Sequence, residues 1–411
     1  MVAKKCRIAN QDTLFELMAE APDISSDGET DIEGELEGLP ETSSGEVSFS
    51  EDECNDDSVE EGVSRKRMLF GISPDMTSCK NLLEHVSAMN NTGFQIPTFN
   101  LIGIPGLEYA HIWISIPFCI MYIIAVFGNT LILFIIKTEE RLHRPMLIFL
   151  CMLAGADLIV VNSVLPKALG IFWFDSREIY LNSCLHQMYI SHVFSSFVLG
   201  WNSFESGVLA LMALDRYVAI TNPLRYTSIL SNQRAGILGL SYLFRSALYF
   251  APCPYLVKRL SYSKNNTIAH TYCEHMSVAK LSCSDITVNI IYGLSITLLN
   301  GAQDISFIIF SYIMILRAVS RLSTWGECWK ALNTCMSHIC VMTVFYIPIL
   351  TTVFIQRFNH SIIPYIHILV ANIYILIPPM VNPLVYGIQT QQIRVKLLSL
   401  ICHIMTELKT I

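Results

Sequence analysis

The sequence predicts an all-α membrane protein, a seven-transmembrane helix bundle with a short amphipathic helix after helix 7. Of the 411 residues, 52% are hydrophobic and only 15% are charged, whereas about a quarter of the residues in soluble proteins are charged. Seven apolar runs have lengths near the roughly 20 residues that cross a bilayer. The strands of a membrane barrel would alternate apolar and polar residues, and this pattern does not appear, so we expect helices.

The predicted helices can be placed in order along the chain. They cover residues 112–136, 146–169, 184–218, 234–256, 286–316, 330–356 and 363–387. After Gly387, Arg394 and Lys396 lie beside several leucines, a pattern typical of a helix along the inner membrane surface. The first 20 residues lack the continuous apolar core of a cleavable signal, so we expect the first transmembrane helix to direct insertion.

The N-terminal segment, residues 1–88, has a different composition from the rest. Residues 1–67 hold 19 Asp or Glu and six Lys or Arg, a net charge of −13, which leaves +6 on the remaining 344 residues. A segment rich in acid, serine and glycine and poor in aromatic residues is predicted to be disordered. It is either an acidic interaction tail or an appended piece without a role in the membrane domain, and we favour the second interpretation. We place the membrane domain at residues 89–411.

The charge of the connecting loops predicts the orientation. Basic residues crowd the loops after helices 1 and 5, namely Lys137, Arg141, Arg144, Arg317, Arg321 and Lys330. Loops rich in Lys and Arg stay in the cytoplasm, although basic residues after helix 4 weaken this bias. The N-glycosylation acceptors Asn90, Asn265 and Asn359 all fall on the opposite face. We therefore expect a multi-pass plasma-membrane protein with its N-terminus outside.

Polar residues inside the predicted spans form a first candidate site. Asp157 in helix 2 and Glu205 in helix 3 are the two acids that we place deep within the spans. Their polar neighbours are Asn129 in helix 1 and Asn382 in helix 7. Ionisable groups within a bilayer are costly and usually functional. Two nearby carboxylates need a cation or a shared proton, so we expect a sodium or proton site; the alternative is a hydrogen-bonded network without an ion.

A second candidate site lies at the inner end of helix 3. Asp215, Arg216 and Tyr217 follow one another there. Adjacent opposite charges can hold each other in one state and separate in another, which suits a switch. Prolines in helices 6 and 7 remove backbone hydrogen bonds and permit kinks about which these helices can pivot.

Taken in order, several segments of residues 89–400 resemble the class I (fish-like) odorant receptors of the rhodopsin-like G-protein-coupled family, nearest their family 52. These segments are GIPGLEYAHIWISIPFC, LHRPMLIFLCMLAGADL, MALDRYVAITNPLRY, HTYCEHMSVAKLSC, KALNTCMSHICVMTVFYIP and PPMVNPLVYG. The resemblance implies a receptor and not an enzyme. It would bind a small odorant in the outer half of the bundle and activate a stimulatory olfactory G protein, which raises cyclic AMP. No nucleic acid and no cofactor other than an allosteric sodium ion are implied.

The resemblance also implies roles for individual residues. Arg216 would be released toward the G protein, with Tyr312 and Tyr386 as its partners on the inner face. Asn382, Pro383 and Tyr386 belong to the NPLVY motif of helix 7. The four polar residues of the first candidate site would line the allosteric sodium site of the family.

Cysteines are expected to tie the outer loops to the bundle. The resemblance implies a disulfide between Cys184 and Cys273, a type of bond that typically stabilises by about 2 to 4 kcal/mol. The family usually has a second outer-loop disulfide, but Ser263 stands where one of its cysteines is expected, so we expect Cys283 to be free. Cys253 is an alternative partner, although a free buried thiol is the simpler interpretation.

Helix 3 departs from the family pattern in length. Cys184 to Arg216 spans 33 residues, seven more than the pattern, and the surplus corresponds to residues 196–202 (SFVLGWN). Seven residues add about 10 Å of helix. Either a bulge at Gly200 absorbs them, or the ligand pocket is distorted and the receptor is impaired.

The ligand site is expected at the outer ends of helices 3 and 6. Arg357, near the outer end of helix 6, can bind a carboxylate through two charge-assisted hydrogen bonds; the alternative is a solvated arginine at the interface. Other expected contacts are His192 as a second donor and the apolar Val353, Phe354 and Met276. The resemblance also implies that Tyr346 lies below the ligand as the activation toggle. We expect short or medium carboxylic acids to be the best ligands.

Three alternatives to an active receptor share the apolar helices. A transporter would show internal repeats at half-length, which are not found. A membrane enzyme would show a metal triad or a nucleophile elbow, and neither appears. A receptor-like product impaired by the helix 3 insertion is the main alternative.

Overall fold

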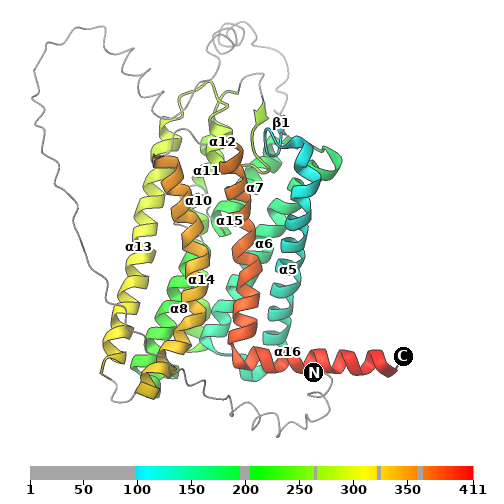
Figure 1. The fold of residues 1–411 in the computed structure, drawn as a ribbon. Helices are drawn as coiled ribbons and strands as arrows, with labels where there is room; N and C mark the ends of the chain where they lie inside the picture. Colours follow the sequence, from blue (N-terminus) through cyan, green and yellow to red (C-terminus); the bar gives the residue numbers. More distant parts are fainter. Residues whose placement is uncertain (1–97, 195–203, 263–265, 322–324, 359–363, 411) are drawn as a thin grey trace, which may run out of the picture. The chain divides into compact units, whose positions relative to one another are not determined.

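The computed structural model describes residues 98–194, 204–262, 266–321, 325–358 and 364–410 (Figure 1). The chain divides into two units, and the helical bundle belongs to Ile72–Ser399. The other unit comprises Met1–Gly71 and Leu400–Ile411. The structure describes residues 400–410 of this unit, which are the end of the last helix. The predictions for residues 1–88 and for glycosylation at Asn90, Asn265 and Asn359 lie outside the described residues.

Helices account for every predicted span. They are α5 (His111–Thr138), α6 (Pro145–Phe174), α7 (Leu181–Phe194), α8 (Phe204–Thr221), α10 (Asn232–Phe250), α11 (Pro252–Lys258), α13 (Thr287–Val319), α14 (Trp325–Phe358), α15 (Pro364–Gln389) and α16 (Gln391–Thr410). The prediction of an all-α bundle is confirmed.

Two predicted spans are each made of two helices. The predicted fourth span divides at Pro252, which begins α11, because proline has no N–H to continue the ladder of α10. The predicted third span corresponds to α7 and α8, and residues 195–203 between them lie outside the described residues.

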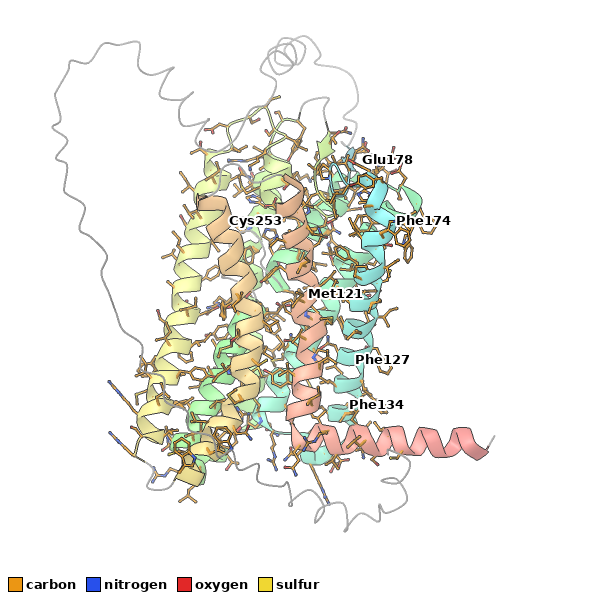
Figure 2. The ribbon with its side chains drawn as sticks, viewed as in Figure 1. Met121, Phe127, Phe134, Phe174, Glu178 and Cys253 are labelled. Atoms are coloured by element: carbon orange, nitrogen blue, oxygen red, sulfur yellow. A yellow bond between two sulfur atoms is a disulfide. The ribbon has the colours of Figure 1, made fainter. Side chains whose placement is uncertain are left out.

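Apolar side chains cover the outside of the bundle as well as its core. Among the described residues, four helical segments are long and apolar enough to cross a membrane, namely Glu108–Thr138, Pro145–Phe174, Thr287–Val319 and Ile368–Ile388. On α5, Ile116, Ile123, Phe127 and Phe134 are all exposed, and Figure 2 shows the two phenylalanines pointing away from the bundle. A large exposed apolar face on a helix of this length suits contact with lipid.

Two helices occupy the centre of the bundle. Helix α6 packs against α5, α7, α8, α10 and α15, and α8 packs against α6, α10, α13 and α14. Every residue of α8 from Phe204 to Ala213 is buried. The polar side chains of this stretch of α8, and Asp157 of α6, are therefore removed from both water and lipid.

A small sheet that the sequence did not predict lies at one end of the bundle (Figure 1). Following the predicted orientation, we call this end the outer end and the opposite end the inner end. Strand β1 (Thr98–Leu101) pairs antiparallel with β2 (Glu178–Tyr180) and parallel with β3 (Thr267–Ile268). The chain then turns at Gly103, which has a φ of 79°. A Cβ atom at this position would lie 2.8 Å from the His111 ring, so both the turn and the contact require glycine.

The predicted amphipathic helix is α16. Near its start, Lys396 Nζ donates to Glu139 Oε2 at 2.8 Å. This hydrogen bond and the charge of Lys396 hold the pKa of the Glu139 carboxyl below its usual value. The pair connects the segment after helix 7 to the loop after α5.

Candidate functional site

The inner end of α8 holds a paired arginine. Arg216 Nη2 lies 3.3 Å from Asp215 Oδ2, and the Tyr226 hydroxyl donates to Asp215 Oδ1 at 2.5 Å. Burial, followed by the charge of Asp215, raises the pKa of Tyr226, so its hydroxyl remains a hydrogen-bond donor at neutral pH. The carboxylate thus holds Arg216 in a paired state, while the neighbouring Tyr217 packs against the inner ends of α13 and α14.

The structure does not bring the two expected tyrosine partners into hydrogen bonds with Arg216. Tyr312 shares a 3.0 Å hydrogen bond with His338 Nδ1, and Tyr386 donates weakly to Met212 Sδ at 3.9 Å. Within the described residues, Arg216 Nε has no hydrogen-bond partner. This arrangement corresponds to the paired state of the predicted switch, in which Arg216 is held by Asp215.

Three of the four residues predicted to bind sodium are linked through α15. Asn382 Nδ2 donates to Asp157 Oδ2 at 2.9 Å, and Asn129 Nδ2 donates to the Pro379 carbonyl at 2.8 Å. Asp157, Asn129 and Asn382 are nearly completely buried, and each has one side-chain oxygen without a hydrogen-bond partner. Oxygen ligands of this kind suit a hard cation. Glu205, the fourth residue, is buried in the first turn of α8.

The expectation of two acids deep within the spans is wrong, because Asp304 is a third. Asp304 lies in α13 and its side chain is fully buried. Its two carboxylate oxygens accept hydrogen bonds from Arg245 Nη1 and Nη2, each at 3.0 Å. Arg245 belongs to α10 and stacks over the Tyr242 ring, 4.3 Å from its centroid.

The pair of Arg245 and Asp304 extends into a cluster that connects four helices. Ser206 of α8 donates to Asp304 Oδ2 at 3.1 Å and shares a 3.1 Å hydrogen bond with the hydroxyl of Tyr346 in α14. We call Ser206, Arg245, Asp304 and Tyr346 the four-helix cluster. It brings the predicted toggle, Tyr346, into contact with a buried ion pair that the sequence analysis missed.

A usable signal for the cluster was present in the sequence. Arg245 lies in the middle of its predicted span, and Asp304 is the one charged residue of the span at 286–316. Charges within a bilayer usually pair with each other, so the two residues could have been matched to one another.

At the outer end, the Cys184–Cys273 disulfide joins α7 to the loop before α12 (His275–Ala279), with Cα atoms 5.4 Å apart. Gln187, one turn along α7, accepts from the Cys273 backbone N–H at 2.9 Å and donates to the Ser163 carbonyl of α6 at 2.8 Å. The disulfide and Gln187 together hold the outer loop over α6 and α7.

The second cysteine prediction is wrong. Cys283 is disulfide-bonded and not free, so the serine at position 263 does not leave it without a partner. Cys253, the proposed substitute, is a buried free thiol. Sequence spacing alone could not identify the partner of Cys283, because bond formation depends on distances between Cα atoms in the folded chain.

Histidines gather below this disulfide. His192 is buried. The centroid of its ring lies 5.6 Å from that of Phe250 and 6.3 Å from that of His275. Asn289 Nδ2 lies 3.2 Å from His275 Nε2. Burial, and then the neighbouring His192, lower the pKa of His275 to about 4, although Glu274 opposes the shift. His275 is therefore neutral at physiological pH.

Glu274 fixes the start of α12. Its carboxylate accepts from the backbone N–H of Met276 at 2.9 Å and of Ser277 at 2.8 Å, as an N-cap does. Burial by itself raises the pKa of Glu274, but the hydrogen bonds from Ser277 and Met276, together with His270, outweigh it and lower the pKa. The cap orients His275, the first residue of α12. Met276 packs against Leu260, Ala279 and Ile286.

The remaining predicted ligand contacts lie on α14. Arg357 is in its last turn, with Val353 and Phe354 in the turn before, and the side chains of these three residues lie outside the described part of the structure. Tyr346, lower on the same helix, belongs to the four-helix cluster.

The end of α7 and the start of α8 lie closer together in space than their separation in sequence suggests. Phe194 ends α7 and Phe204 begins α8, yet their ring centroids lie 6.0 Å apart. In one straight helix these two residues would be separated by about 15 Å along the axis. The two helices therefore approach each other more closely than an uninterrupted helix would allow. Gly200, the predicted bulge, lies outside the described residues.

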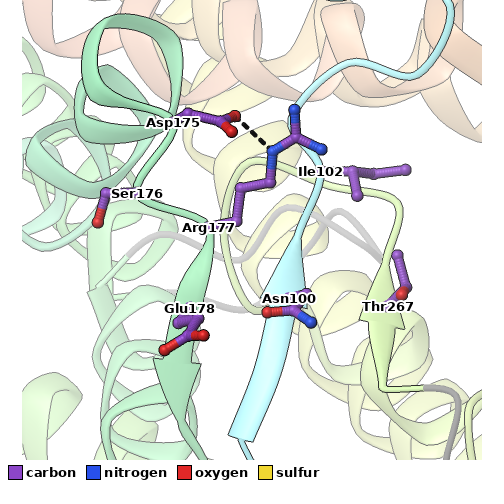
Figure 3. A pocket seen from close by; sticks show the side chains of 7 residues that line it. All are labelled: Asn100, Ile102, Asp175, Ser176, Arg177, Glu178 and Thr267. Atoms are coloured by element: carbon purple, nitrogen blue, oxygen red, sulfur yellow. Dashed lines mark hydrogen bonds and ion pairs between the residues drawn. The ribbon is translucent and has the colours of Figure 1, made fainter.

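A polar pocket of about 530 Å³ borders the outer sheet (Figure 3). It is lined by Asn100, Ile102, Asp175, Ser176, Arg177, Glu178 and Thr267. Arg177 Nε donates to Asp175 at 2.5 Å across it. None of the predicted ligand contacts lines this pocket.

Known proteins are similar to this chain over most of its length. The olfactory receptor family profile matches residues 118–404. Olfactory receptor 51E2 of Rattus norvegicus is 45% identical over 312 residues, which cover 76% of this chain and 95% of that protein. Human olfactory receptors 52N4 and 52A1 are 48% and 45% identical, over 74% and 77% of this chain and 94% and 100% of their own lengths.

Among solved structures, squid rhodopsin matches with a TM-score of 0.56 at 17% sequence identity, over 71% of this chain and 80% of that chain. At this level of identity the match concerns the fold. It is the seven-helix fold that the apolar runs predict.

Proposed function

This chain belongs to the olfactory receptor family of seven-helix membrane receptors, and from that premise we propose that it is an odorant receptor for small carboxylic acids. As in its family, a small molecule is the ligand and a G protein is the partner. We further propose that the G protein is a stimulatory one, so that ligand binding raises cyclic AMP.

The four-helix cluster is the observation that carries this proposal. A ligand in the outer half of the bundle would lie above Tyr346, whose hydroxyl reaches Asp304 through Ser206. A change in the position of Tyr346 therefore alters a hydrogen-bond network with a fully buried carboxylate at its centre. Such networks favour discrete arrangements over gradual ones. Arg216, held by Asp215 at the inner end of α8, is the group that would be released.

The acid specificity rests on Arg357 and the histidines. Arg357 is in the last turn of α14, and a guanidinium can bind a carboxylate through two parallel hydrogen bonds. His192 supplies a further polar group from α7, beside the aromatic ring of Phe250. Together they would bind the carboxylate, and Val353, Phe354 and Met276 would contact the aliphatic tail.

A reporter assay for cyclic AMP with matched acids, alcohols and esters tests the proposal. We expect the acids to give the strongest responses and Arg357→Ala to weaken acid responses far more than neutral ones. Surface delivery of both chains is measured in parallel. Equal responses to acids and alcohols would reject an ion pair between Arg357 and the ligand. If the chain reaches the surface but gives no response to any ligand, the result would favour a receptor-like product impaired by the helix 3 insertion.

We propose that Asp157, Asn129, Asn382 and Glu205 bind a sodium ion. The buried oxygens without hydrogen-bond partners on the first three residues support a hard cation at this place. A bound ion that prefers one state stabilises that state. We expect sodium to raise the thermal stability of the purified receptor relative to potassium, and Asp157→Asn to remove the difference. Identical melting temperatures in both salts would leave the hydrogen-bonded network without an ion as the explanation.

We also propose that the receptor domain is residues 89–411 and that its N-terminus is outside in the plasma membrane. The Cys184–Cys273 disulfide supports placing the outer loop in an oxidising compartment. The aligned relatives match about three quarters of this chain and nearly all of their own length, which supports an appended segment of residues 1–88.

A further inference from the structure

Two tryptophans stand at the inner end of α14. Trp325 is the first residue of the helix and is 79% exposed, and Trp329, one turn later, is 61% exposed. Neither the ligand site nor the Arg216 switch uses them. Neighbouring exposed aromatic side chains form an apolar patch, and such patches mark sites of contact with a membrane or another protein.

Both indoles lie on the side of α14 that faces away from the bundle. Exposed positions recur every three or four residues along the helix, at Trp325, Trp329, Asn333, Met336, Ile339, Thr343 and Ile347. The opposite face packs inward and carries the buried His338, Val341 and Phe345. Between the two faces, Cys335 is buried beside α13 and Cys328 Sγ lies 3.6 Å from the Val319 carbonyl. The tryptophans therefore begin the same stripe that continues with Met336, Ile339 and Ile347 along the apolar part of the helix.

Trp329 stands at the inner edge of the transmembrane part of the helix. The apolar run of residues 330–356, which predicts this span, begins directly after Trp329, and Trp325 lies one turn further from the hydrocarbon core, about 6 Å along the helix. Indole rings combine an apolar body with an N–H donor and are enriched at this boundary.

Charge at the same end favours a lipid surface. Arg317 is in the last turn of α13 and Arg321 follows two residues after that helix ends, and both are exposed. Basic residues next to a transmembrane helix are attracted to anionic headgroups of the inner leaflet. An apolar aromatic pair beside basic side chains thus complements the boundary between the acyl chains and anionic headgroups.

We propose that Trp325 and Trp329 form an interfacial anchor that binds the headgroup boundary of the inner leaflet and holds the inner end of α14 at a defined depth. Because α14 also carries Tyr346 and His338, the anchor sets how freely this helix moves relative to Arg216. The occupant is phospholipid; a G protein or a second receptor copy would give different results in the experiment below.

Tryptophan fluorescence of the full chain, one receptor per lipid nanodisc, tests the anchor. Subtracting the spectrum of the W325F/W329F chain isolates the signal of the two indoles. Lipids brominated near the glycerol backbone or near the chain terminus report depth, and aqueous iodide reports exposure to water. We expect backbone-proximal bromines to quench most of the isolated signal, terminal bromines to quench little of it, and iodide to quench weakly.

The matched control is the W113F chain, which removes one exposed indole from the outer end of α5 and should leave the isolated signal in place. Strong iodide quenching with no effect of brominated lipid would overturn the proposal, because the rings would then lie in water. If the signal becomes shielded from both quenchers only after G protein is added, the two tryptophans bind a protein partner and the lipid anchor is rejected. If the double variant is poorly expressed, W325F and W329F taken singly give the same decisive comparison.

Discussion

His275 is a buried histidine of the outer loop whose ring is uncharged at neutral pH. His275 is buried between His192, Asn289 and Glu274, so a proton on its ring would add charge where water cannot reach. Neutral imidazole can accept or donate a hydrogen bond with Asn289, whereas imidazolium can only donate. The outer loop is thus adapted to an uncharged ring.

This environment predicts a pH-dependent stability. The folded pKa of His275, about 4, lies below the ordinary value of 6.5, so the unfolded chain binds more protons between these values. The stabilising contribution is present above about pH 6.5 and is lost as the pH falls toward 4. We expect His275→Gln, which keeps a polar partner for Asn289, to flatten the melting temperature over this range.

Thermal unfolding of the two chains between pH 7 and pH 4 in detergent measures the effect. His186→Gln is the control, because this histidine lies on the exposed side of α7. Parallel pH profiles for the unmodified chain and His275→Gln would show that His275 does not titrate as described.

Between helices, the buried pair of Arg245 and Asp304 connects α10 to α13 through two hydrogen bonds. Removing one partner of a buried ion pair leaves an uncompensated charge and typically costs about 3 to 5 kcal/mol. We expect Arg245→Ala and Asp304→Ala each to lose stability of this order, and the double variant to lose much less than the sum. A double-mutant cycle on detergent-solubilised receptor measures the coupling.

Arg177→Ala is the matched control for that cycle, since Arg177 pairs with exposed Asp175 at the surface. Exposed pairs contribute about 1 kcal/mol or less. Strictly additive losses for Arg245 and Asp304 would contradict a direct coupling between α10 and α13.

The insertion in helix 3 is a second feature at the level of helices. Removing residues 196–202 would place Phe194 and Phe204 three positions apart, about 4.5 Å along a helix. Rings at that spacing can keep the observed 6.0 Å contact. The deletion should therefore join α7 and α8 without moving either helix.

We expect the shortened chain to retain the Cys184–Cys273 disulfide and to reach the cell surface at least as well as the unmodified chain, with a larger ligand response. Flow cytometry of surface receptor and non-reducing peptide mapping measure the two properties. Loss of surface delivery or of the disulfide would show that residues 196–202 are needed for the path of helix 3.

Across the whole molecule, the bundle was predictable from sequence because each span must bury about 20 apolar residues in lipid. The paired Asp215 and Arg216 and the hydrogen bond between Asp157 and Asn382 join residues that the sequence analysis had grouped. Asp304 was missed because a single acid hardly changes the mean hydropathy of a long apolar run. The break at Pro252 depends on where a proline lies relative to its helix, and the state of Cys283 depends on distances in the folded chain. Apolar patterning specifies neither.

In the proposed mechanism, ligand binding at the outer ends of the helices releases Arg216 from Asp215 at the inner end. The most direct measurement is the cyclic AMP response of Arg216→Ala alongside its surface delivery, with Arg225→Ala, an exposed arginine of the same inner loop, as the control. We expect normal surface delivery and loss of the ligand response for Arg216→Ala, with the response of Arg225→Ala largely retained. A normal rise in cyclic AMP from Arg216→Ala would contradict this mechanism.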